Sequence, residues 1–247
     1  MIIVGIDDTD IIGSRGTNQL ARQIVHELSA DWSCLRIVRH QLLDDPRVPY
    51  TSKNGSASIA LQRRQDSLRS PDLAGETPSA VDSVLQCCRR VMRDWFIEGS
   101  DPGLCLLTGE CPPEVVEWGR RCQSEFVARE TAFAIAAAVG LHLEALGGTE
   151  DGVIGALAAV GLAWAQNDGR IIQLGEWPDD LSGAQPVDAL RSRDVCVQGY
   201  GTDQKITDGT VDVGKHLRPN VRQGAAVLFV EADATHSPHL YQAVKLP

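Results

Sequence analysis

The spacing of apolar residues along the first 110 positions switches repeatedly between a strand-like and a helix-like pattern. An unbroken apolar run at residues 2–6 predicts a short buried strand. Leu20, Ile24, Val25 and Leu28 then recur at helical spacing and predict a helix over residues 18–28. Further strands are expected at residues 35–43, 56–61 and 103–108, and a long amphipathic helix is expected to begin at residues 77–78. This alternation is typical of a mixed α/β (α+β) fold.

The second half of the chain continues the alternation and then becomes richer in short strands. Long helices are expected over residues 125–146 and 153–165, joined by a glycine-rich loop, and a strand is expected at residues 170–174. Residues 175–184 are rich in Asp, Pro and Gly, which is typical of a linker. Strands are expected beyond it at residues 195–200, 210–213 and 226–231. We therefore predict two domains, residues 1–175 and a smaller β-rich region at residues 185–247.

Composition and charge narrow the classes of function. The longest apolar stretch, residues 131–146, is too short to span a bilayer, and no signal peptide is recognisable, so we expect no membrane association. The seven cysteines show neither metal-ligand nor disulfide-framework spacing, which favours a reducing, cytoplasmic location. With 23 basic and 33 acidic residues the net charge is -10, and no dense basic cluster is present. These features favour a small-molecule substrate over tRNA.

The first predicted strand runs directly into three carboxylates, Asp7, Asp8 and Asp10. If the extended geometry continues, Asp8 and Asp10 point the same way, because side chains alternate along a strand. Carboxylates this close repel each other unless one is protonated or a hard cation such as Mg²⁺ lies between them. The alternative is an acidic turn whose side chains bind nearby backbone N–H groups.

The segment after the acids has the composition of an anion-binding loop. Gly13, Ser14 and Gly16 precede the predicted helix, and Thr17 or Asn18 is placed to cap it. The free N–H groups at a helix start suit phosphate, although the chain contains neither a Walker A sequence nor a GxGxxG motif.

Two further loops have both a structural and a functional interpretation. Lys53 and Asn54 precede Gly55. In the structural interpretation they form only a hairpin turn, and in the functional one they reach a phosphate. The loop at residues 147–152 is either a helix terminator followed by an acidic helix start, or a second wall of the same site in which Glu150 or Asp151 binds metal or ribose.

Three of these segments, in the same order, resemble the archaeal tRNA-Ile agmatinylcytidine synthetases, the TiaS family: residues 5–10, 46–57 and 152–161. The resemblance covers roughly the first two thirds of the chain. It implies a kinase-like ATP-binding core, with Asp7, Asp8 and Asp10 serving Mg²⁺ and the ATP phosphates, and Asp8 and Asp10 as the metal ligands. It also implies contacts to the nucleotide from a larger set: Gly13, Ser14, Gly16, Lys53, Asn54, Gly148 and Thr149.

The chain also departs from the family pattern. The loop after the acids is shorter, so Thr17 is either the counterpart of a phosphorylatable threonine of the family or only a helix cap. A chain of 247 residues is expected to lack the OB-type RNA-binding and zinc-ribbon modules of TiaS. Residues 185–247 are expected to form a shortened counterpart of its ferredoxin-like module.

The resemblance implies an Mg²⁺- and ATP-dependent phosphotransferase or ligase-type enzyme that activates an unidentified small-molecule acceptor by phosphorylation. Asp7 is then expected to position the attacking group or a second metal ion. Three alternatives stay open: a tRNA cytidine-modifying enzyme that needs a separate RNA-binding partner, a non-catalytic nucleotide-binding regulator, and a protein whose acids bind only a structural metal.

Overall fold

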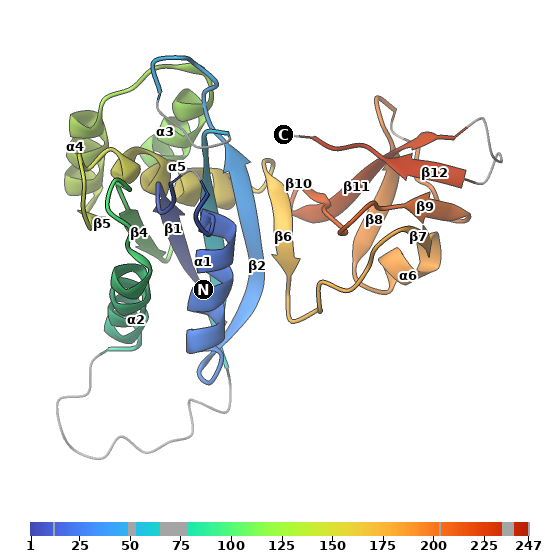
Figure 1. The fold of residues 1–247 in the computed structure, drawn as a ribbon, viewed down its shortest axis with the longest axis horizontal. Helices are drawn as coiled ribbons and strands as arrows, with labels where there is room; N and C mark the ends of the chain where they lie inside the picture. The colour runs from blue at the N-terminus through green and yellow to red at the C-terminus, as the bar shows by residue number, and fades with distance from the viewer. Residues whose placement is uncertain (12, 49–52, 65–78, 203, 234–239, 247) are drawn as a thin grey trace.

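The computed structural model describes residues 1–11, 13–48, 53–64, 79–202, 204–233 and 240–246. Its first six elements are β1 (Ile2–Asp7), α1 (Thr17–Leu28), β2 (Trp32–Gln41), β3 (Gly55–Arg63), α2 (Ala80–Trp95) and β4 (Gly103–Thr108). Their strands form an antiparallel sheet in the order β4-β1-β3-β2 (Figure 1). This βαββαβ order is that of ferredoxin-like folds, and it confirms the mixed α/β character expected for the first part of the chain. The polar, proline-containing sequence at residues 63–76 predicts a loop, and most of it lies outside the described residues.

The next four elements add a second helical layer. They are α3 (Pro113–Ser124), α4 (Arg129–Val139), β5 (His142–Ala145) and α5 (Gly152–Ala165). Helices α1 and α2 cover one face of the sheet, whereas α5 lies on the other face and packs against α3 and α4 (Figure 1). The single helix expected over residues 125–146 is wrong, because Gly140 takes a left-handed φ of 67° that ends α4 and lets the chain turn into the edge strand β5.

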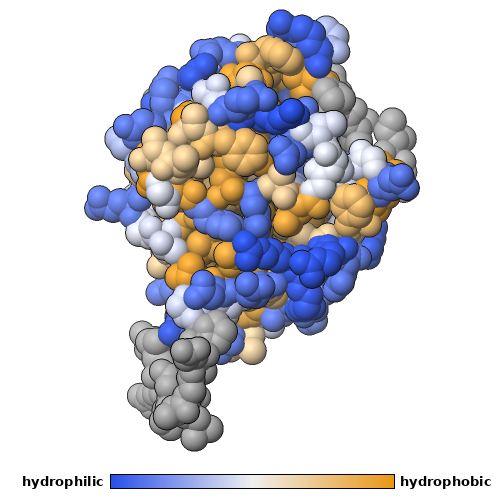
Figure 2. Space-filling model, turned by 90° about the vertical axis from the view of Figure 1, so that its left-hand side faces the viewer, coloured by the Kyte–Doolittle hydropathy of each residue, from blue (hydrophilic) through white to orange (hydrophobic). Residues whose placement is uncertain are grey.

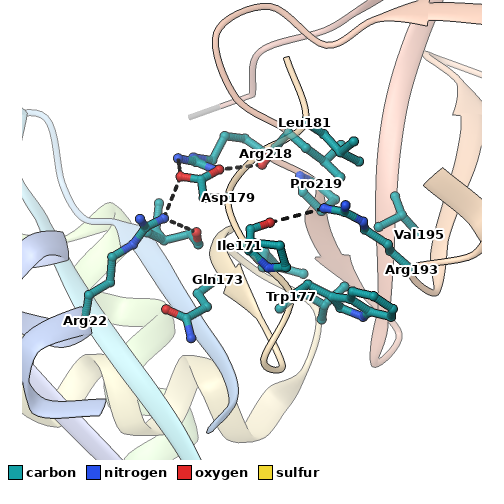
Figure 3. Close-up of a pocket in the computed structure, with 14 residues that line it drawn as sticks. Arg22, Ile171, Gln173, Trp177, Asp179, Leu181, Arg193, Val195, Arg218 and Pro219 are labelled. Carbon is teal, nitrogen blue, oxygen red and sulfur yellow. Dashed lines mark hydrogen bonds and ion pairs between the residues drawn. The ribbon is translucent and has the colours of Figure 1, made fainter. Parts of the chain in front are cut away.

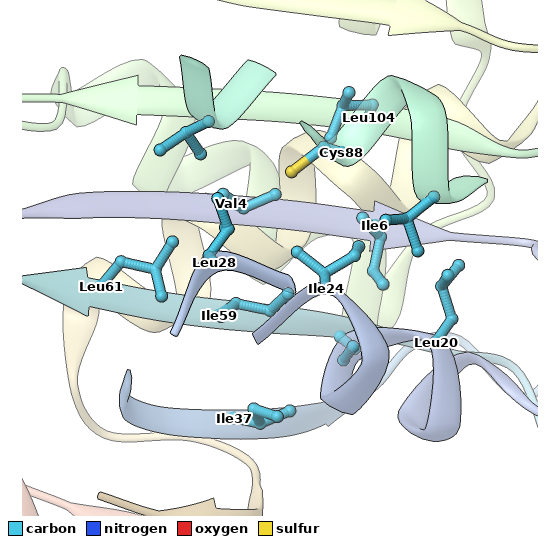
Figure 4. Packing of buried hydrophobic residues seen from close by; sticks show 14 of the residues in the cluster. Val4, Ile6, Leu20, Ile24, Leu28, Ile37, Ile59, Leu61, Cys88 and Leu104 are labelled. Atoms are coloured by element: carbon cyan, nitrogen blue, oxygen red, sulfur yellow. The ribbon is translucent and has the colours of Figure 1, made fainter. Parts of the chain in front are cut away.

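Alternation along β1 explains why the sheet is buried on both faces. Ile2, Val4 and Ile6 pack with α1 and α2, and Ile3 packs with α5. On the first side, α1 inserts its buried stripe of leucine and isoleucine between β1, β3 and α2 (Figure 4). The unbroken apolar run at the start of the chain is therefore the signature of a central strand.

Small residues let α5 approach the sheet closely. A Cβ atom placed on Gly5 of β1 would lie 2.0 Å from the backbone oxygen of Ala156, so no side chain fits between the two elements. Gly152 and Gly161 have similar backbone neighbours within 2.0 Å of such a Cβ. The glycine- and alanine-rich sequence of α5 is thus a packing device, and it fixes the first turn of α5 at the carboxyl end of β1.

The rest of the chain is β-rich. Strand β6 (Arg170–Leu174) pairs with β2 and, through Arg170 and Asn220, with β10 (Asn220–Arg222). The other elements are β7 (Ala184–Pro186), α6 (Val187–Arg191), β8 (Val195–Gly199), β9 (Thr210–Asp212), β11 (Ala225–Ala232) and β12 (Leu240–Ala243). Parallel pairing of β8 with β11 and of β9 with β12 makes the whole sheet mixed.

The ferredoxin-like order that we expected at residues 185–247 occurs at the other end of the chain. The described part of residues 185–247 contains the single five-residue helix α6 among its strands, and a βαββαβ unit needs two helices. The domain division near residues 175–184 stays a prediction.

The surface over α4, β5 and α2 mixes apolar and charged side chains (Figure 2). Part of its charge is fixed in ion pairs, such as that between Arg89 on α2 and Glu144 on β5, 2.7 Å apart. None of the helices in the described part of the chain is long and apolar enough to cross a membrane.

Candidate functional site

A cavity of about 380 Å³ opens where the carboxyl end of β1 meets the first turn of α5. Asp7, Asp8 and Asp10 line it, together with Lys53 and Asn54 from the segment that precedes β3. The structure therefore brings together two sets of residues that lie more than forty positions apart in the sequence. Register explains the meeting, because β1 and β3 are antiparallel neighbours and the end of β1 lies beside the start of β3.

Asp8 does not continue the strand. Its φ of 49° is in the left-handed region, which aspartate tolerates better than most residues, and β1 ends at Asp7. The condition under which Asp8 and Asp10 would point the same way, an extended chain through both residues, is therefore not met. Instead, the turn is fixed by a hydrogen bond of 3.0 Å from the N–H of Asp101 to the carbonyl oxygen of Asp8.

The acidic cluster is larger than the motif in the sequence, because Asp101 and Asp151 also line the cavity. Burial, followed by the charge of Asp8, raises the pKa of Asp7 to about 8. Burial and then the charges of Asp101 and Asp10 raise the pKa of Asp8 to about 6. The carboxylates thus repel one another, and the cluster favours either a proton or a cation.

Sequence reasoning missed Asp101, although a signal was available. Asp101 lies just before β4, and Gly103 at the start of β4 pairs with Asp7 at the end of β1. The end of β1 and the start of β4 lie side by side, so acids at these two positions lie at the same edge of the sheet. That pairing could not be read from either segment alone.

The donor set suits a hard cation that other ligands help to hold. Within the described residues, no three His, Cys, Asp or Glu side chains are arranged to hold a metal ion by themselves. Mg²⁺ usually takes only one or two carboxylates and completes its shell with water and substrate phosphates. Asp8 and Asp10 therefore fit Mg²⁺ only together with such a phosphate-bearing ligand.

Asp7 lies against the first turn of α5. A Cβ atom on Gly155 would be 1.7 Å from Oδ2 of Asp7, so only glycine leaves room for this carboxyl group. The similarity of residues 152–161 to TiaS thus marks a packing motif and one wall of the site at once. The start of α5 also carries the positive end of the helix dipole, which favours negative charge nearby.

The loop at residues 147–152 reaches the cavity mainly through Asp151 and Gly152. Gly148 and Thr149, which we expected to contact a nucleotide, do not line the cavity. Thr149 instead donates its backbone N–H and its hydroxyl, the latter at 2.5 Å, to the carboxylate of Asp101. A Cβ atom on Gly148 would collide with the same carboxylate. Both residues therefore position Asp101.

Thr17 is the first residue of α1, and Gly16 is the N-cap, without a side-chain capping bond. The cap role considered for Thr17 is therefore wrong. The Thr17 hydroxyl accepts a hydrogen bond from Thr9 at 3.0 Å and donates one to Oδ1 of Asp10 at 3.4 Å. Thr17 thus touches the acidic cluster without lining the cavity.

The glycine loop before α1 was also expected to contact the nucleotide. Gly13, Ser14 and Gly16 are not among the residues that line the cavity. The Ser14 hydroxyl closes its own loop by bonding the N–H and the carbonyl oxygen of Ile11, each at 2.9 Å. The loop shapes the turn between the acids and α1.

Cationic and apolar side chains also line the cavity, and one of the cations, Arg129, pairs with Asp151 at 3.2 Å. Arg47, Lys53 and Arg129 supply positive charge, and Phe126, which is 55% exposed, supplies an aromatic surface. The guanidinium carbon of Arg47 lies 4.6 Å from the centre of the Phe126 ring, and Asp45 holds that guanidinium through two bonds of 2.8 Å. Apart from Lys53, sequence reasoning assigned none of these residues to the site.

The fold and the site together define a class: a ferredoxin-like α/β core with an acidic cavity faced by cations and an apolar wall. No protein-family model matches the chain. The tRNA(Ile2) 2-agmatinylcytidine synthetase TiaS of Pyrococcus horikoshii is 26% identical over 162 residues, which are 65% of this chain and 35% of TiaS. The chain is thus distantly homologous to TiaS over 65% of its length and matches about a third of that protein.

Solved structures of TiaS share the fold. The TiaS–tRNA(Ile2)–ATP complex has a TM-score of 0.53 and 20% identity, over 65% of this chain and 36% of that one. Apo TiaS has a TM-score of 0.52 and 19% identity, over 65% and 35% of the two chains. At this identity the structural likeness concerns the fold alone.

Proposed function

We propose that the cavity binds ATP with Mg²⁺ and that the protein is a phosphotransferase or ligase-type enzyme. The observation that carries this proposal is that one cavity contains the carboxylates Asp8 and Asp10, the cations Lys53 and Arg129, and an apolar wall. A nucleoside triphosphate needs these three kinds of contact. TiaS, the distant homologue, has been crystallised with ATP and with AMPCPP and agmatine.

Each group has a defined task in this proposal. Asp8 and Asp10 hold Mg²⁺, which when bound would neutralise phosphate charge and polarise the transferred group. Lys53, Arg47 and Arg129 neutralise the remaining phosphate oxygens, and the exposed ring of Phe126 gives the base a surface to stack on. Phosphoryl transfer depends mainly on such positioning and charge stabilisation.

Asp7 is suited to the acceptor side of the reaction. Its carboxyl lies at the base of the cavity against Gly155, and its pKa is raised to about 8. A carboxyl with a pKa near neutrality accepts a proton from an attacking hydroxyl more readily than an ordinary aspartate does. Asp7 therefore positions the attacking group, or binds a second metal ion when one is present.

The acceptor is a small molecule in our first proposal, because the net charge of -10 disfavours a long polyanion. A second candidate is a tRNA cytidine-modifying enzyme that works with a separate RNA-binding partner. The observation that favours it is the set of cations Arg47, Lys53 and Arg129 around an acidic site, in a distant homologue of a tRNA-modifying enzyme.

Calorimetric titration with ATP, with and without Mg²⁺, tests the proposal. Wild-type protein is expected to bind ATP in an Mg²⁺-dependent manner, and Asp8→Asn is expected to lose that dependence. Asp94→Asn, which changes an exposed carboxylate on α2, is the matched control and should bind like the wild type. Absence of ATP binding to wild-type protein with Mg²⁺ would refute the proposal.

Turnover then separates the candidates. ATP hydrolysis or phosphoryl transfer stimulated by a small amine or alcohol supports the first candidate, and stimulation by tRNA supports the second. Tight binding without turnover under either condition would identify a nucleotide-binding regulator, the alternative suggested by the short loop before Thr17.

A further inference from the structure

A second cavity, of about 200 Å³, lies where α1 and β6 meet residues 177–181 and 217–219 (Figure 3). It shares no lining residue with the acidic cavity. Three arginines line it: Arg22 from α1, Arg193 from the segment before β8, and Arg218 from the loop before β10. The ring of Trp177, which is 48% exposed, completes the wall.

Asp179 is an internal anion for this pocket. Its carboxylate accepts two parallel hydrogen bonds from Arg218, at 2.8 and 2.7 Å, and one from Arg22 at 2.8 Å. His216 lies 3.3 Å from the same carboxylate. This is the fork-to-carboxylate geometry in which arginines recognise carboxylates and phosphates, and the chain itself provides the occupant.

Positive charge remains in excess around Asp179. Arg193 pairs with Asp180 at 2.6 Å and its guanidinium lies 5.4 Å from the centre of the Trp177 ring. Three guanidinium groups therefore face two carboxylates. Arg170 adds a further cation next to Arg218, and its buried Nε has no hydrogen-bond partner among the described residues. Such a basic pocket is unexpected in a chain of net charge -10 and calls for an anion.

We propose that this pocket binds a small metabolite carrying a phosphate or carboxylate group, which takes the guanidinium of Arg218 from Asp179 and rests against Trp177. The volume of about 200 Å³ is below the roughly 300–1,000 Å³ of pockets for drug-sized ligands, so a compact anion fits and a dinucleotide does not. Residues 217–219 line this pocket and do not line the acidic cavity.

The ligand would connect two parts of the chain. Arg22 belongs to the first helix of the ferredoxin-like core, whereas Arg193 and Arg218 belong to the β-rich C-terminal region. An anion shared by these arginines ties that region to the core, as Asp179 does in the structure described here. The proposal is independent of nucleotide binding in the acidic cavity.

Calorimetric titration in metal-free buffer with EDTA tests the proposal, because phosphates have no cation there to bridge them to the acidic cavity. The two probes are inorganic pyrophosphate and citrate, which distinguish a phosphate-type from a carboxylate-type ligand. Arg218→Gln is expected to weaken binding of the effective probe at least about tenfold, the effect of losing a two-point contact to an anion. Arg120→Gln, on the exposed face of α3, is the matched control and should bind like the wild type.

The Asp179→Asn variant distinguishes an aspartate that competes with the ligand from one that only supports the structure. Removing the internal competitor is expected to tighten binding of the same probe about tenfold, whereas a purely structural aspartate would leave binding unchanged or weaken it. Trp177→Phe should remove the fluorescence change that the probe causes. Circular dichroism checks that each variant is folded. If Arg218→Gln does not fold, Arg193→Gln takes its place in the experiment. The proposal is overturned if neither probe binds at about 10 mM, or if Asp179→Asn fails to bind more tightly.

Discussion

Replacement of Asp7 by asparagine should make the protein more stable at alkaline pH. Burial and the neighbouring carboxylates raise the pKa of Asp7 from 3.8 to about 8. Between these two values the folded protein holds a proton that the unfolded chain has released. The stability of the folded protein is therefore not reduced by Asp7 below about pH 4, and it falls progressively as the pH rises toward 8.

The expected magnitude follows from the size of the shift. Each unit of pKa difference corresponds to about 1.4 kcal/mol, so a shift of about four units sets an upper limit of ~6 kcal/mol. The effective dielectric constant around such groups is well above that of a dry interior and reduces this cost, so we expect a loss of about 3 kcal/mol in the free energy of unfolding between pH 5 and pH 8.5. The amide of the Asp7→Asn variant cannot ionise. Between pH 5 and pH 8.5 this variant should lose only the smaller part of the free energy of unfolding that depends on ionisation of Asp8.

Urea unfolding in metal-free buffer at pH 5, 7 and 8.5 measures this difference, with the midpoint followed by circular dichroism. Asp94→Asn on the exposed side of α2 is the control and should follow the wild-type profile. Parallel pH profiles for wild type and Asp7→Asn would show that Asp7 ionises normally, and the account of the acidic cluster would then be wrong.

Three further substitutions test the site and its support. At pH 7.5, ATP at ten times its Kd in the presence of Mg²⁺ should stabilise wild-type protein by about 1.4 kcal/mol, and Asp8→Asn should remove most of this gain in a thermal melt. Thr17→Ala should cost about 1 kcal/mol in urea unfolding by removing the hydroxyl between Thr9 and Asp10, and Thr17→Ser should cost much less; equal losses would contradict this. Gly5→Ala should cost more than about 3 kcal/mol, because its Cβ would collide with the backbone of α5, and an unchanged unfolding midpoint would disprove that contact.

Much of the first half of the fold could be predicted from the spacing of apolar residues. The strand at residues 103–108 and the helix beginning near residue 153 agree closely with β4 and α5, because both are buried and bounded by glycine or acidic loops. Strand β5 was missed because its four residues continue the apolar pattern of α4, and only the left-handed Gly140 separates them. The short strands β7, β10 and β12 were missed, whereas the equally short β9 was predicted, because three or four residues carry too little periodicity for a dependable prediction.

The candidate site was predictable only where it is contiguous in sequence. Asp7, Asp8 and Asp10 form a visible motif, and the pairing of β1 with β3 places Lys53 and Asn54 in the same cavity. Asp101 and Arg129 were missed, because each becomes part of the cavity through a strand pairing or a helix position that its own segment does not reveal. Single residues at an element boundary carry no pattern of their own.

The helix α5 explains why the site and the core cannot be varied independently. The same first turn that buries Val153 in the second core also leaves the gap at Gly155 in which Asp7 lies. A larger residue at Gly155 would push the carboxyl of Asp7 toward water, lower its pKa and separate α5 from β1 at the same time. The packing of α5 and the charge state of Asp7 therefore depend on the same atoms. A small-residue motif shared with a distant homologue is for this reason evidence about the geometry of the site as well as about the fold.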